Sequence, residues 1–188
     1  NTVTPGTYLY YSGTHPALQV QMGLYGLLKK DAPAATPEAY PGIPYAAEAT
    51  WIFGEIDFDV HAAVADGTYG TAITSMIHSV PEVYVLNGEP YGLGGVVSQP
   101  VAGGQTTLVR LLSACYDERI PVVSGYHLSL VAEDGRAYPH ARVENADNLP
   151  ALKTRDALLT PVSGTTSVTV YDRRWLSIGV VARSMLVR

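Results

Sequence analysis

The sequence predicts an all-β domain, a sandwich or a barrel, and three observations support this fold class. Aromatic residues are mostly tyrosine, with 13 Tyr against two Phe and two Trp, and tyrosine favours pleated, half-buried surfaces. The chain contains 18 Gly and 13 Pro, which mark turns between short segments. Apolar segments are short and separated by turn signals, with little helical pattern between them. A chain of 188 residues is long enough to bury a sizeable core.

The expected strands follow one another from the first residues to the last. They cover residues 6–12, 24–28, 50–57, 82–86, 105–114, 126–132, 156–160, 167–171 and 178–187. Residues 18–22 also alternate apolar side chains with Gln19 and Gln21, as a strand does. Asn87-Gly88 is a strong turn signal, and Asp134-Gly135 predicts a hairpin. The one expected helix is short and lies near residues 60–65.

A proline-rich stretch provides the best domain boundary. Residues 31–45 contain four prolines, which exclude a helix or a central strand there. We therefore expect a Pro/Ala linker at 31–45, between a terminal segment at 1–30 and a domain at 46–188. The chain does not begin with Met, so we expect a processed or fragmentary N-terminus.

Charge excludes some partners. The net charge of −5 argues against nucleic-acid binding, and no apolar run approaches the ~20 residues that span a bilayer. Residues 31–109 hold nine acidic residues and no Lys or Arg. This block could attract cations or a basic partner, or form a solvated sheet face. Within it, Glu55, Asp57 and Asp59 alternate and would share one strand face, either as a Ca²⁺ site or as a solvated edge.

The residues that usually carry catalysis form no recognisable motif. The histidines are His15, His61, His78, His127 and His140, and no two have the spacing of a metal-binding pair. No serine stands in a G-x-S-x-G elbow, which argues against a hydrolase. Cys115 is the single cysteine, so the chain can form no intrachain disulfide. We expect it to be a buried core thiol without a metal.

Residues 5–28 read PGTYLYYSGTHPALQVQMGLYGLL and resemble the end of the first cupredoxin domain of multicopper oxidases, the laccase-like enzymes. That family has a G-T-Y-x-Y-H-S-x-H pattern, a Gln-rich stretch and M-G-L-Y-G. Later segments, such as VLNGEPY at 85–91 and GYHLSLVAEDG at 125–135, resemble its second cupredoxin domain. The resemblance implies a cupredoxin-like Greek-key β-sandwich at 46–188 and terminal strands of an incomplete first domain at 1–30.

The resemblance also implies copper, but the ligand set is incomplete. The family binds one copper through Cys and His and a trinuclear cluster through His-x-His pairs. Tyr11 stands at the first histidine of the Y-H-S motif, and a neutral phenol is a weak ligand. His15 alone matches a metal ligand, and Cys115 has no neighbouring histidine. We identify no catalytic residue, and expect no oxidase activity from this chain alone.

Three hypotheses remain open. The chain is a multicopper-oxidase-like subunit or fragment within a larger assembly, a copper-free structural or assembly protein, or part of an active copper-dependent oxidase completed by other chains. Residues 1–30 either bind another chain, giving a homo- or hetero-oligomer, or fold back on their own domain. We expect a secreted, periplasmic or cell-surface location.

Overall fold

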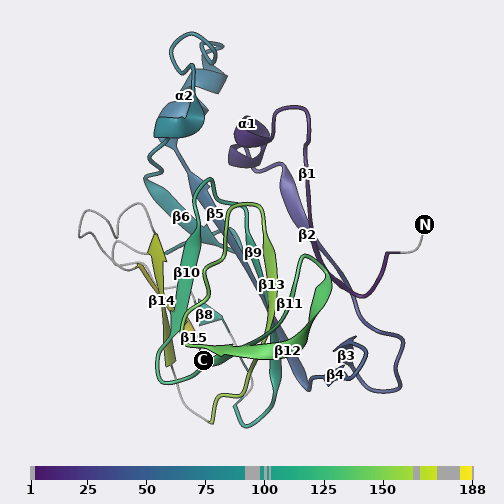
Figure 1. The fold of residues 1–188 in the computed structure, drawn as a ribbon. Helices are drawn as coiled ribbons and strands as arrows, with labels where there is room; N and C mark the ends of the chain where they lie inside the picture. The colour runs from purple at the N-terminus through teal and green to yellow at the C-terminus, as the bar shows by residue number, and fades with distance from the viewer. Residues whose placement is uncertain are drawn as a thin grey trace.

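The computed structural model describes residues 3–91, 98–99, 101, 103–162, 166–172 and 183–187. Two β-sheets are its main layers (Figure 1). The seven-stranded sheet has the order β12-β11-β13-β9-β5-β6-β7, and the four-stranded sheet has the order β10-β14-β15-β8. The strands of the first sheet are β5 (Ala47–Ile56), β6 (Val83–Leu86), β7 (Glu89–Tyr91), β9 (Thr107–Ser113), β11 (Leu128–Glu133), β12 (Arg136–Glu144) and β13 (Thr154–Leu159). Those of the second are β8 (Ser98–Gln99), β10 (Arg119–Val123), β14 (Thr166–Asp172) and β15 (Arg183–Val187).

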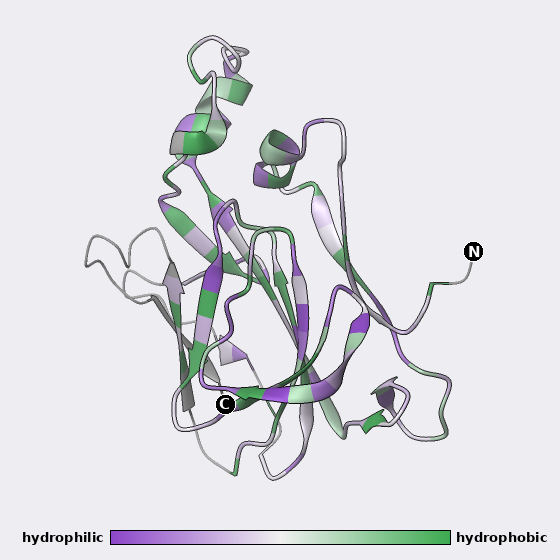
Figure 2. Ribbon diagram, viewed as in Figure 1, coloured by the Kyte–Doolittle hydropathy of each residue, from purple (hydrophilic) through white to green (hydrophobic). Residues whose placement is uncertain are grey.

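The main core lies between these two sheets. β5 and β9 pair in parallel at the middle of the larger sheet, with Trp51 opposite Leu111, and every residue of β9 is buried. Side chains from both sheets contribute to one cluster, which includes Trp51, Phe53, Leu111, Leu130, Val123, Val168 and Val170. Figure 2 shows the hydrophobic residues along these strands in green. The fold is therefore an all-β sandwich, as expected.

Local turn signals hold in the structure. Asn87 (φ 51°) and Gly88 (φ 86°) join β6 to β7, and Asp134 (φ 46°) and Gly135 (φ 72°) join β11 to β12. Positive φ at both central residues is what a tight two-residue hairpin requires. The short helix expected near residues 60–65 is α2 (Phe58–Ala65).

Residues 18–22 are not a strand, which corrects our expectation. α1 (Pro16–Gln21) occupies this place, with His15 as its N-cap. Proline at the first helical position is preorganised for a helix start, and this local signal outweighs the short alternation. α1 connects β1 (Gly6–Tyr11) to β2 (Tyr25–Lys30), which pair antiparallel as a separate two-stranded sheet.

The proline-rich segment contains structure of its own. β3 (Glu38–Tyr40) and β4 (Ile43–Pro44) form a two-stranded sheet. Tyr40 is 3% exposed and packs in a cluster with Leu108 and Ala132 of the large sheet. The domain boundaries at 30/31 and 45/46 remain our proposal.

Residues 1–30 contact the rest of the chain, which is the fold-back arrangement. Thr7 of β1 is fully buried and its hydroxyl donates to Asp156 Oδ1 on β13 at 2.6 Å. Val20 of α1 packs against Leu112 and Ala114.

A short 3₁₀ helix, η1 (Met76–His78), follows the loop after α2. In the described part of the chain, no helix is long and apolar enough to cross a membrane.

Candidate metal-binding site around His15

His15 begins α1 and is exposed to solvent. Its ring Nδ1 accepts a hydrogen bond from the backbone N–H of Leu18 at 3.3 Å. The backbone N–H of His15 donates to Gln19 Oε1 at 3.0 Å. These two bonds satisfy backbone groups that a helix start leaves free. Because Nδ1 serves as the cap, Nε2 is the ring nitrogen left for a ligand. The ring also meets Tyr69 edge-on, with centroids 5.7 Å apart.

The segments on either side of His15 and α1 carry exposed apolar side chains. Tyr11, at the end of β1, pairs in register with Tyr25 and is 44% exposed. Tyr10 is 62% exposed and Leu24 52%. The start of β1 is therefore buried at Thr7, whereas its end, with Tyr10 and Tyr11, is exposed to solvent.

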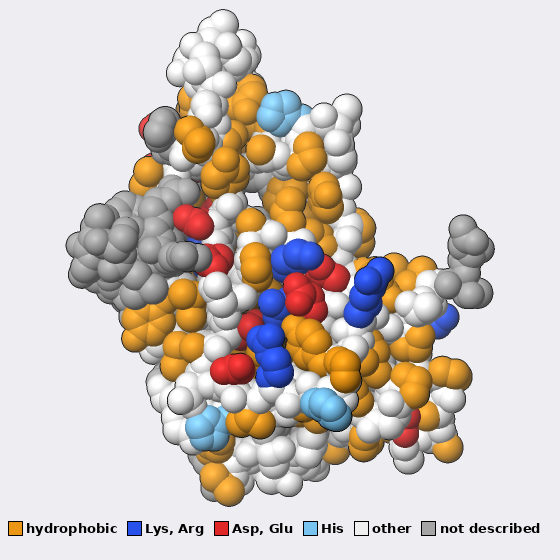
Figure 3. All heavy atoms as spheres, viewed as in Figure 1, with side chains coloured by type: hydrophobic (Ala, Val, Ile, Leu, Met, Phe, Trp, Pro, Cys, Tyr) orange, Lys and Arg blue, Asp and Glu red, His pale blue; other side chains and the backbone are white. Residues whose placement is uncertain are grey.

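None of the other histidines with a described side chain joins His15 in a group of potential metal ligands. His61 lies on α2, with Nε2 3.1 Å from the backbone oxygen of Gln21. His127 precedes β11 and His140 lies on β12, and both are exposed. Figure 3 shows histidines on this face as separate patches, one at the end that carries α1 and α2 and others at the opposite end. The side chain of His78 lies outside the described part of the structure.

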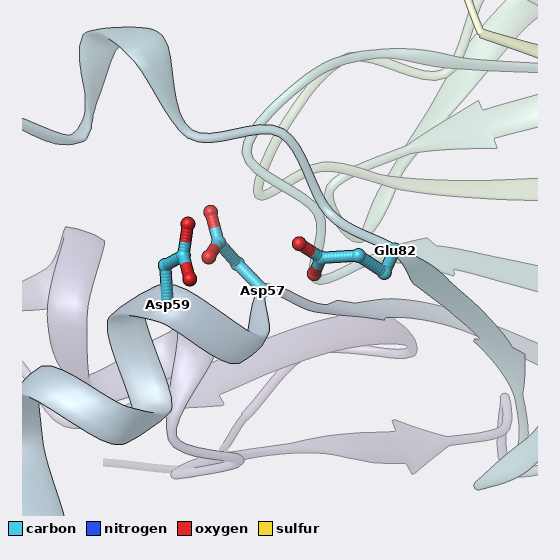
Figure 4. Close-up of side chains that lie close together, drawn as sticks. All are labelled: Asp57, Asp59 and Glu82. Atoms are coloured by element: carbon cyan, nitrogen blue, oxygen red, sulfur yellow. The ribbon is translucent and has the colours of Figure 1, made fainter.

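One group of potential ligands does come together in the described residues, and it contains no histidine. Oxygens of Asp57, Asp59 and Glu82 lie within 4.8 Å of one another (Figure 4). Asp57 Oδ1 caps α2 by accepting from the Val60 N–H at 3.0 Å, and its Oδ2 accepts from Ser79 Oγ at 2.6 Å. Glu82 accepts from the Phe58 N–H at 2.8 Å. These bonds give the cluster a role in capping the helix.

Glu55, Asp57 and Asp59 do not share one strand face, contrary to expectation. β5 ends at Ile56, so that Asp57 and Asp59 belong to the start of α2. Glu55 forms a buried ion pair with Arg119, and Asp57 is 4% exposed. The alternative prediction of a solvated edge was therefore also wrong for Glu55 and Asp57, which are both buried. The alternation of acidic residues crosses the boundary between β5 and α2, where Asp57 is the N-cap of the helix.

Cys115 is 1% exposed and follows β9, as expected for a core thiol. Burial raises its pKa from 9.0 to about 12, with the nearby Arg119 guanidinium opposing the shift. Metals bind the thiolate rather than the thiol. Burial therefore works against a metal at this sulfur.

Solved structures resemble this chain over nearly its whole length. A blue copper oxidase from Nitrosomonas europaea superposes with a TM-score of 0.68 at 13% identity, covering 92% of this chain and 50% of its own. Fet3p, a multicopper oxidase that functions in iron import, gives 0.72 at 16% identity, covering 98% and 34%. A laccase from Botrytis aclada gives 0.68 at 14% identity, covering 98% and 35%. No family model and no curated protein matches the sequence.

The chain thus has the cupredoxin-like fold of the multicopper oxidases, which confirms the resemblance seen in its sequence. It spans between about a third and half of the length of these solved structures. The donors in the described part of the chain do not fit a complete copper centre. His15 offers one exposed imidazole, whereas a copper oxidase site needs several imidazoles or a thiolate.

Proposed function

We propose that this chain is a multicopper-oxidase-like cupredoxin subunit or fragment that acts within a larger assembly. Within the part of the chain that the structure describes, no set of side chains forms a complete copper centre. His15 is its one contribution to a metal site, through Nε2, and the remaining ligands come from other chains or domains. Any oxidoreductase activity belongs to the completed assembly.

The observation that carries this proposal is the place of His15. It follows β1, whose last two residues Tyr10 and Tyr11 are exposed on opposite faces of the strand, and the imidazole is exposed as well. An exposed ligand that follows exposed aromatic side chains along the chain is suited to a site that is completed when another protein covers this segment. We propose residues 1–30 as the segment that binds this protein, as a homo- or hetero-oligomer.

A copper-free structural or assembly role is the second candidate. Tyr11 favours it, because tyrosine replaces the histidine that the family motif has at this position. The group of Asp57, Asp59 and Glu82 also provides only hard oxygen ligands, which suit copper less than imidazole does. Under this alternative the chain keeps its contact surface and binds no copper in any assembly.

Copper titration of the purified chain tests the proposal. With Cu²⁺ added to one equivalent, electron paramagnetic resonance should show weak binding with nitrogen hyperfine structure, and His15→Ala should abolish it. His127→Ala is the matched control, since His127 is also exposed but follows a different part of the fold. Equal loss in both variants, or no copper in the native assembly by elemental analysis, rejects the role of His15.

The assembly role is tested separately. Tyr10→Ser should weaken association in sedimentation velocity without lowering stability, because Tyr10 is 62% exposed. Phe58→Ser is a matched control, because Phe58 is 55% exposed on α2. An unchanged sedimentation profile for Tyr10→Ser in the native assembly rejects this contact surface.

A further inference from the structure

A pocket of about 270 Å³ lies beneath α1, on the inner side of the helix that His15 caps. Its walls come from four places in the chain. They include Ala17 and Val20 of α1, Met76 of η1, Cys115 after β9, and Ala151 and Leu152 before β13. The pocket exists because several of these side chains are small, so the space between helix and sheet is not filled.

The walls of this pocket are fixed by other contacts. Val20 packs against Leu112 and Ala114. The side-chain amide of Gln21, in the orientation that satisfies both of its ends, donates to the Glu55 carbonyl at 3.0 Å and accepts from the Asp57 N–H at 2.6 Å. The N–H of Leu152 donates to the Ser113 carbonyl at 2.9 Å. The cavity is therefore preformed, as small-molecule sites usually are.

The lining offers almost no polar group to a ligand. The Gln21 amide is occupied by the backbone bonds just described. Cys115 keeps its proton, because burial raises its pKa to about 12, and a neutral thiol behaves as a small apolar group. Tyr116, which is 40% exposed, adds one phenol to the lining, and the other walls are hydrocarbon or thioether. A charged ligand would lose its hydration here without gaining a partner.

We propose that this pocket binds a small, uncharged, apolar molecule of about one or two fused six-membered rings. An apolar cavity of about 150 Å³ is large enough to bind benzene, and the pocket is somewhat larger, near the lower limit of about 300 Å³ for typical ligand sites. Such a molecule contacts the Met76 thioether, which adapts to ring edges. The site does not depend on copper or on the assembly role of His15.

The chain carries its own reporter for a binding experiment. It has three methionines, of which Met76 lines the pocket. With ¹³C-methyl-labelled methionine, toluene should shift the Met76 methyl resonance saturably and leave the Met22 resonance in place. Benzoate, with the same ring and a negative charge, should cause no such shift. Shifts of both methyl groups in parallel, or no saturation, would overturn the proposal.

Filling the pocket provides the second arm. Ala17→Leu should weaken toluene binding at least tenfold, and Ala62→Leu, on the exposed face of α2, should not change it. Ala151→Leu fills the same space from another element and replaces Ala17→Leu if that variant does not fold. If toluene fails to bind the wild-type chain while Ala17→Leu breaks its association with another chain, the pocket receives a partner's side chain and the proposal is wrong.

Discussion

Arg110 on β9 donates a hydrogen bond from Nη1 to the hydroxyl of Thr7 on β1 at 2.8 Å, across 103 residues of sequence. Thr7 in turn donates to Asp156, and Arg110 Nη2 donates to Asp31 Oδ1 at 2.5 Å. Tyr40 donates its hydroxyl to the other oxygen of Asp156 at 2.5 Å. A buried polar network therefore joins the first 45 residues to the sandwich, in addition to apolar packing.

Replacing Arg110 should destabilise the chain strongly. In Arg110→Met the buried carboxylate of Asp156 loses its cation, and breaking a buried pair in this way costs about 3–5 kcal/mol. Thr7→Val should cost less, about 1–3 kcal/mol, because it removes an uncharged partner. Urea unfolding of the full chain measures both. Arg142→Met is the control, since Arg142 has 52% of its side chain exposed, and a similar loss in that variant would contradict the special role of Arg110.

Gly135 should tolerate alanine less well than Gly125. Both glycines have positive φ, 72° and 78°, so both substitutions carry a similar backbone cost of about 1 kcal/mol. A Cβ on Gly135 would also lie 2.2 Å from the ring of Tyr8, whereas a Cβ on Gly125 meets nothing within 4 Å. Gly135→Ala should therefore cost about 1–3 kcal/mol more in free energy of unfolding. Equal effects in thermal unfolding would show that β1 does not press on this hairpin turn.

The thiol of Cys115 should make the fold sensitive to alkali. The folded thiol keeps its proton up to a pKa of about 12, whereas the ordinary value is 9.0. Above pH 9 the unfolded chain releases this proton and the folded chain does not, so stability falls as pH rises. In Cys115→Ala this loss should be smaller by about 1 kcal/mol per pH unit between pH 9 and 11. Guanidinium unfolding at each pH measures the slopes, and identical slopes for both proteins would contradict the buried thiol.

Local signals predicted the elements whose chemistry lies within a few residues. Asn87-Gly88 and Asp134-Gly135 need only their own backbone geometry, and both turns formed where expected. β10 was not expected because Pro121 stands inside it. The hairpin expected at Asp134-Gly135 implied β12, but its bounds could not be given because its residues are mostly exposed and show no apolar alternation. β10 gains its backbone bonds from the distant strand β14, which no local pattern contains, whereas β12 pairs with its neighbour β11 across the Asp134-Gly135 turn.

The candidate site was predictable in part for the same reason. His15 and Pro16 are neighbours and together form a local signal for a helix start. The alternation of residues 18–22 predicted a strand instead, whereas the structure has α1 there, capped by His15. The network of Thr7, Arg110 and Asp156 could not be predicted, because its members are more than 40 residues apart and polar groups are usually exposed. Burial of Arg110, which is fully enclosed, becomes understandable only once three segments are brought together.

Restoring a histidine at position 11 should strengthen copper binding by the isolated chain. Tyr11 stands where the multicopper oxidase motif has a histidine, four residues before His15, and two imidazoles that reach one ion bind it more tightly than one. Tyr11→His should raise Cu²⁺ affinity at least tenfold in calorimetric titration, with a second nitrogen in the paramagnetic resonance spectrum. Tyr10→His is the control, because neighbouring residues of β1 point to opposite faces of the strand. An equal gain from Tyr10→His would mean that the surface binds copper without a defined geometry, and no gain from Tyr11→His would favour the copper-free role.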